Sequence, residues 1–331
     1  MANQQVLYHY CSVETFLSII RNRTLRMSDI GKSNDYMETK WLLEYFEDEV
    51  LRQYNEEPFL NSDSVIYGLN DIDTLKFFIK NEKQKIFKRN DELFYVTCFS
   101  KNGDKLSQWR GYADDGNGIS IGFSTEVLKD IAIKEELLTL RKVIYPCNKD
   151  PEQKIIYLDD RALEGIKNYA RSFLESIYYA LSTGDTNSIY FNEYAMNYFH
   201  SLSTSILIRE SLFFKNPAFE EEEEWRLVLH EELDKYSTEW ENWYCSSEEK
   251  PLLSGYFSER FPNGLQFRST RNKIISFFDL SFKGYEKEII KHIYIGPKSE
   301  VEENDIYQLL RYYGYQEFDQ IKIEKSKSTY R

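Results

Sequence analysis

The sequence predicts an α+β protein in which a mixed or antiparallel β core is interrupted by a helical insertion. Short β-type runs occur near both ends of the 331-residue chain, and a long helical stretch lies between them. Hydrophobic residues make up 41% and aromatic residues 16%, which is enough to build a sizeable core. We expect residues 1–150 and 215–331 to form the two parts of one composite core, with residues 151–214 as an insertion or cap.

The first third of the chain predicts two short strands and three helices. Residues 6–10 (VLYHY) are β-branched and aromatic, and Ser12 stands where it can cap the helix that follows. Residues 25–29 predict the second strand. Amphipathic helices follow over residues 36–54 and 73–88.

The middle and the C-terminal part are rich in strand signals. These are apolar, β-branched or aromatic runs bounded by turn residues or proline. We expect strands over residues 93–100, 118–124, 137–146, 224–230, 265–269, 273–282, 289–296 and 319–326, with one helix over residues 301–314.

Aromatic side chains recur at helical spacing within residues 151–214. They are Tyr169, Phe173, Ile177 and Tyr178 in one helix and Tyr194, Tyr198 and Leu202 in the next. We expect these helices to pack together on one side of the sheet. Plain packing and a partner or oligomer surface are both open.

Charge and motif spacing exclude several classes. The net charge of −13 disfavours sequence-independent DNA binding, which requires phosphate neutralisation. The four cysteines and four histidines form no zinc-binding spacing, so no metal site is expected from them. The chain shows neither a signal-peptide pattern nor an apolar window of about 20 residues. We expect a cytoplasmic protein without a membrane partner.

Three groups of side chains could carry chemistry. His9 lies at the end of the first strand, where it can face a ligand or bind a neighbouring carbonyl. Alternation along residues 224–230 puts Glu224 and Arg226 on one face, as a catalytic carboxylate with its partner or as a structural ion pair. Trp109, Arg110 and Tyr112 can form a stacking platform for a purine or nicotinamide ring, or Trp109 can fill the core.

Several blocks resemble one bacterial family. They are LYHYCSVETFLSIIRNRTLRMSD, SNDYMETK, YVTCFSKNGDKLSQWRGYADDGNGISIGF, FFKNPAFEEEEEWRLV and IIKHIYIGPKS. In this order they resemble the family called domain of unknown function 2971 (DUF2971). The blocks span nearly the whole chain, with the helical middle as the variable part.

The opening block is also similar to the start of ADP-ribosyltransferases that modify nucleic acids. That resemblance implies an ADP-ribosyltransferase-like core and NAD as substrate. It implies that His9 binds NAD, that Ser100 or Tyr112 supports the nicotinamide end, and that Glu224 stabilises the oxocarbenium-like transition state. The remaining NAD-binding candidates are Tyr10, Ser12, Trp109 and Arg226. A toxin or phage-defence effector acting on nucleic acid or protein is the implied role.

Two other functions remain open. One is a non-enzymatic sensor or interaction module that uses the aromatic-rich helices. The other is a nuclease-like effector with Asp35, Glu38 and Glu224 around Mg²⁺. We expect His9, Ser12, Trp109, Tyr112, Glu224 and Arg226 to line a single cleft if the protein is the transferase. His9 and Glu224 on opposite faces would contradict this NAD site and favour the interaction module. Three carboxylates within reach of one metal ion would favour the nuclease.

Overall fold

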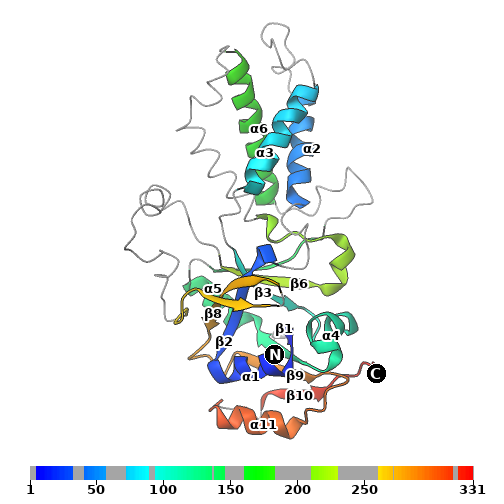
Figure 1. Cartoon of the computed structure of the whole chain (residues 1–331), viewed down its shortest axis with the longest axis vertical. Helices are drawn as coiled ribbons and strands as arrows, with labels where there is room; N and C mark the ends of the chain where they lie inside the picture. Colours follow the sequence, from blue (N-terminus) through cyan, green and yellow to red (C-terminus); the bar gives the residue numbers. More distant parts are fainter. Residues whose placement is uncertain are drawn as a thin grey trace. The chain divides into compact units, whose positions relative to one another are not determined.

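The chain divides into two compact units, a sheet-containing unit and a helical unit (Figure 1). The first comprises residues 1–34, 93–143 and 220–331, and the second comprises residues 35–92 and 144–219. The computed structural model describes residues 5–32, 41–56, 72–88, 94–135, 138–145, 160–182, 210–229, 260–270, 272–315 and 320–330.

The sheet of the first unit confirms the α+β prediction. Its main path runs β10–β9–β4–β1–β3–β2–β8–β7, with β6 beside β3 and β5 beside β6. Only the β9–β10 pair is parallel among these strands. The strands are β1 Val6–Cys11, β2 Thr24–Asp29, β3 Tyr95–Ser100, β4 Ile119–Ser124, β5 Leu138–Lys142, β6 Glu224–Leu229, β7 Gln266–Ser269, β8 Ile274–Ser281, β9 Ile290–Ile295 and β10 Lys322–Lys325.

The sheet forks at β3. On one edge of β3, β1 pairs at Ser100 and β2 pairs at Val96 and Tyr95. β6 runs along the other edge from Tyr95 to Ser100. The side chain of Thr97 donates a 2.7 Å hydrogen bond to the carbonyl of Arg26, so a side chain bridges the strands where they separate.

The main hydrophobic core lies on one face of this sheet. Leu7, Phe99, Phe123 and Leu227 are buried there, on β1, β3, β4 and β6. The helices α1 Val13–Asn22, α5 Thr125–Lys134 and α11 Glu303–Tyr312 contribute their apolar stripes to the same core. A shorter helix, α4 Leu106–Tyr112, instead packs with Tyr10.

The start of α1 confirms the predicted cap. The Ser12 hydroxyl accepts a 3.2 Å hydrogen bond from the backbone N–H of Thr15, which satisfies one free donor of the first turn. The helix ends at Arg23, which adopts a left-handed conformation (φ 56°). Ser12 therefore caps a helix, which accounts for its position without a ligand.

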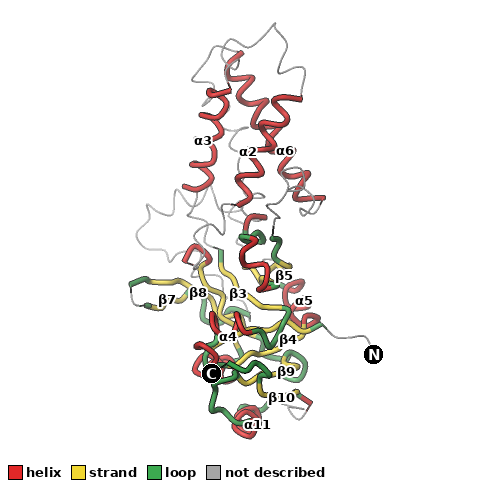
Figure 2. The backbone as a smooth tube through the Cα atoms, turned by 90° about the vertical axis from the view of Figure 1, so that its right-hand side faces the viewer, coloured by secondary structure: helices red, strands yellow, loops and turns green. Residues whose placement is uncertain are grey.

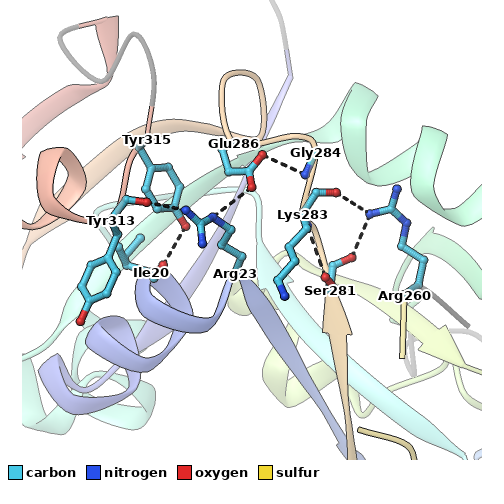
Figure 3. Close-up of polar contacts among 9 residues, drawn as sticks. All are labelled: Ile20, Arg23, Arg260, Ser281, Lys283, Gly284, Glu286, Tyr313 and Tyr315. Atoms are coloured by element: carbon cyan, nitrogen blue, oxygen red, sulfur yellow. Dashed lines mark hydrogen bonds and ion pairs between the residues drawn. The ribbon is translucent and has the colours of Figure 1, made fainter. Parts of the chain in front are cut away.

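Arg23 joins three segments at the end of α1 (Figure 3). Its Nε atom lies 2.9 Å from Oε1 of Glu286 in the β8–β9 connection, and its guanidinium donates to the carbonyl of Tyr313 after α11. The hydroxyl of Tyr315 in turn donates to the carbonyl of Ile20. These contacts attach the C-terminal segments to the N-terminal helix.

The helical unit contains α2 Trp41–Glu56, α3 Ile72–Lys88 and α6 Asp160–Ser182. Phe46 of α2 lies against Tyr169 and Phe173 of α6, with ring centroids 4.9 and 5.5 Å apart. Because these rings are buried together, residues 35–92 belong to the same unit as the helical stretch. The sequence had instead predicted that residues 35–92 belong to the N-terminal part of the core. The predicted second helix with Tyr194, Tyr198 and Leu202 lies outside the described residues.

No helix among the described residues is long and apolar enough to cross a membrane.

Candidate functional site

His9 lies on the core face of the sheet. Its ring approaches that of Phe99, with centroids 6.0 Å apart, and its Nδ1–H donates a 3.0 Å hydrogen bond to the carbonyl of Cys98. Burial lowers the pKa of His9, and the bond to Cys98 only partly opposes this shift. His9 thus binds a neighbouring carbonyl at the fork of the sheet, as the structural alternative predicted.

Glu224 and Arg226 form a buried ion pair at the start of β6. The Nε atom of Arg226 lies 2.7 Å from Oε1 of Glu224, and the side chains are 0% and 5% exposed respectively. The predicted pairing on one strand face is therefore confirmed. Because Arg226 has no exposed surface, it positions Glu224 and does not offer a ligand contact of its own in this structure.

Two predicted residues meet next to this ion pair through Glu222. The hydroxyl of Ser100 donates a 2.8 Å hydrogen bond to the carbonyl of Glu222, and the Tyr112 hydroxyl donates a 3.0 Å bond to Oε1 of the same residue. Ser100 also lies directly opposite Glu224 across the β3–β6 ladder. The backbone between Glu222 and Glu224 is strained, since Glu223 has φ 45°.

Tyr10 and Trp109 pack against each other on the same face of the sheet as Ser100. Their rings meet edge to face with centroids 4.9 Å apart, and Trp109 is fully buried. The indole N–H donates a 2.7 Å hydrogen bond to Asp104. Of the two alternatives for Trp109, the structure shows core packing and not an exposed platform, because its ring fills the space between α4 and β1. Tyr112 is 46% exposed, and its hydroxyl is held by Glu222.

The predicted single cleft is not formed, because His9 and Glu224 lie on opposite faces. Cross-strand partners share a face, and the register aligns Tyr8 of β1 with Ser100 and Ser100 with Glu224. His9 is the next residue after Tyr8 and points to the other face. Register decides the face, and it depends on strand pairing that a single sequence does not reveal. This result contradicts the predicted NAD site that contains both His9 and Glu224, and it favours the interaction module.

The remaining candidates gather on the face opposite to His9. Glu224, Ser100 and Tyr10 belong there by strand alternation, and α4 brings its residues against Tyr10. Six of the eight predicted residues thus share one region: Tyr10, Ser100, Trp109, Tyr112, Glu224 and Arg226. His9 and Ser12 do not.

The same face carries a hydrogen-bonded chain that the sequence analysis missed. The Tyr8 hydroxyl lies 3.1 Å from Nδ1 of His292, and Nε2 of His292 lies 3.0 Å from Oε2 of Glu324. The ring of Tyr294 lies tilted against that of His292, with ring centroids 4.1 Å apart. Figure 2 shows β4, β9 and β10 in the succession that brings these residues together. Separations of 284 and 32 residues leave no spacing signal in the sequence.

The nuclease-like alternative finds no support in the described residues. Within them, no group of three or more histidine, cysteine, aspartate or glutamate side chains could hold a metal ion. Asp35 and Glu38 lie outside the described residues.

Comparison with known proteins supports one family. A family model described as "Protein of unknown function (DUF2971)" matches residues 108–227, from within α4 to within β6. No curated protein matches the chain, and no solved structure does. The match supports the resemblance to DUF2971, and the similarity to ADP-ribosyltransferases stays a prediction.

Proposed function

We propose that this protein is an ADP-ribosyltransferase-like enzyme that uses NAD to modify a macromolecule, with Glu224 as the essential carboxylate. The observation that carries this proposal is the pairing of Glu224 with Ser100 across two strands, with the carboxylate held by Arg226. The acceptor is nucleic acid or protein. The proposed role is that of a toxin or phage-defence effector in the cytoplasm.

The chemistry requires a fixed negative charge. Cleavage of the bond between nicotinamide and ribose develops positive charge on the ribose, which an ionised carboxylate stabilises. Arg226 holds one carboxylate oxygen of Glu224 at 2.7 Å, so the group is oriented before the substrate binds. Ser100 and the partly exposed Tyr112 are the two hydroxyl-bearing candidates for the nicotinamide end, and both bond to Glu222.

Access to Glu224 is restricted, because only 4% of the residue is exposed. We infer that substrate binding displaces part of the acidic run 220–223, which immediately precedes Glu224. Glu223 has a positive φ of 45°, and we infer that a displacement there relieves backbone strain. His9 takes no part in the proposed site, which separates this proposal from the one based on sequence order.

The test is nicotinamide release from NAD, together with transfer of labelled ADP-ribose to RNA, DNA and protein. We expect Glu224→Gln to lower the rate by about 10²–10³-fold. Glu220→Gln is the matched control, because Glu220 is an exposed member of the same acidic run. His9→Asn should leave the rate unchanged. Equal rates for wild type and Glu224→Gln would refute the role of Glu224.

The interaction module is the second candidate, because His9 and Glu224 lie on opposite faces of the sheet. Wild-type protein that neither binds NAD nor releases nicotinamide would leave this candidate in place of the enzyme.

A further inference from the structure

We propose that Tyr8, His292 and Glu324 form a second catalytic site, in which His292 activates the Tyr8 hydroxyl as a nucleophile toward neutral acyl esters. The chain of hydrogen bonds Tyr8–His292–Glu324 has the order nucleophile, base and orienting carboxylate. Neither the NAD proposal nor the sequence analysis uses any of the three residues.

The sheet is built so that Tyr8 and His292 can meet across an intervening strand. The register places Gly122 of β4 directly between them, opposite Tyr8 on one side and His292 on the other. A Cβ atom at Gly122 would lie 2.9 Å from Cε1 of Tyr8 and 3.0 Å from Cβ of His292. Glycine at this position therefore leaves the space in which the hydroxyl reaches the imidazole.

A second glycine holds the Tyr8 ring. A Cβ atom at Gly103 would lie 2.3 Å from Cε1 of Tyr8, so the backbone of the β3–α4 connection rests directly on the ring. Tyr294 contacts the ring from β9, with centroids 5.9 Å apart. Tyr8 is nevertheless only half-buried, which leaves part of its side chain open to solvent.

The proton positions follow from the partners. Hydrogen bonds from Lys322 and His292 lower the pKa of Glu324, so its carboxylate is ionised and accepts the Nε2–H of His292. Burial lowers the pKa of His292 below 6.5, so the imidazole is neutral at pH 7 and its Nδ1 atom is bare. Nδ1 then accepts the hydroxyl proton of Tyr8.

Tyr8 needs this base, because it does not ionise by itself. Burial, and then the charges of Tyr294 and Glu324, raise its pKa to about 12. Its proton must therefore leave during the attack. The Tyr8 oxygen forms a bond to the carbonyl carbon, and the proton moves to Nδ1 of His292. The bond to the leaving alkoxide or phenoxide breaks, and that oxygen takes the proton. Water then hydrolyses the acyl–tyrosine ester.

The surrounding charge selects the electrophile. Glu324 is the last group of the hydrogen-bonded series Tyr8–His292–Glu324. The charge of Asp104 also acts on Tyr294, the neighbour of His292. The charge of Glu324, which also acts on Tyr8, disfavours an incoming phosphate or carboxylate anion. An uncharged carbonyl or sulfonyl centre is the class that the site accepts.

Phenylmethanesulfonyl fluoride is a neutral probe for this nucleophile, because attack by Tyr8 forms a stable sulfonate ester and releases fluoride. We expect peptide mass spectrometry of the full chain to find Tyr8 modified faster than Tyr312, although Tyr312 is 82% exposed. His292→Gln should slow the modification by about 10²-fold or more. Glu324→Gln should slow it by a smaller factor, and Glu303→Gln serves as the matched control.

The rate should also fall at acidic pH, once the pH reaches the lowered pKa of His292 and the imidazole is protonated. The titratable and charged groups around His292 are Tyr8, Tyr294, Glu324 and Lys322. All four ionise well away from the pH range in which His292 is protonated. A folded Glu324→Gln protein with the wild-type rate, or Tyr8 modified no faster than Tyr312, overturns the proposal. A merely structural hydrogen-bond chain would give that result.

Discussion

Replacing Glu224 with glutamine should destabilise the sheet-containing unit strongly. The substitution keeps the shape of the side chain but removes the negative charge that lies 2.7 Å from the Arg226 guanidinium, which is 0% exposed. Removing one member of a buried pair costs about 3–5 kcal/mol, because the remaining charge is not solvated. This value exceeds what a surface carboxylate would give. A functional test of Glu224 must therefore be run where the variant is still folded.

Urea unfolding followed by tryptophan fluorescence measures this cost. With a denaturant slope of about 2 kcal/mol/M, the midpoint of the transition should fall by about 1.5–2.5 M. Asp279→Asn is the control, because its ion pair with Arg26 is partly exposed and contributes only about 0–1 kcal/mol. The double variant Glu224→Leu, Arg226→Met should recover most of the loss. A Glu224→Gln cost below about 1 kcal/mol would refute the reasoning.

Three further stability predictions follow from single contacts. The pKa of His9 lies below its unfolded value of 6.5, so its contribution to stability should be fully present above pH 6.5 and decline as the pH falls. The variant His9→Asn should weaken this decline, as measured by urea titrations at pH 7.5 and 5.5. Asp104→Ala should cost about 1–3 kcal/mol, since the buried indole N–H of Trp109 loses its acceptor; an unchanged melting temperature would contradict this. Phe46→Ala should cost about 3–5 kcal/mol by opening a cavity against Tyr169, seen as earlier loss of helical circular dichroism; a cost under about 1 kcal/mol would show that the two helices do not share a core.

Most strands of the sheet-containing unit could be predicted from the sequence, whereas the helix α5 at Thr125–Lys134 was not expected. The expected strand at residues 273–282 is observed at Ile274–Ser281, and the expected helix at 301–314 is observed at Glu303–Tyr312. Both segments combine a clear period with turn or capping residues. Such local signals do not depend on the partner strand, and for this reason both predictions are confirmed.

The arrangement of side chains across strands could not be predicted in the same way. His9 and Tyr8 differ by one position, and only the pairing of Tyr8 with Ser100 decides which of them shares a face with Glu224. The Tyr8–His292 contact joins strands from opposite ends of the chain. The Glu224–Arg226 pair was predictable, because both residues belong to one strand and alternation alone aligns them.

A crystal structure with a non-hydrolysable carbocyclic NAD analogue tests the central claim most directly. The account predicts that the analogue binds on the face that carries Ser100 and Tyr10, with its nicotinamide-side ring hydroxyl within hydrogen-bond distance of Glu224. Residues 220–223 should be displaced relative to the present structure, and His9 should keep its bond to the carbonyl of Cys98. An analogue bound against His9 on the core face, or no binding at millimolar concentration, would contradict the account.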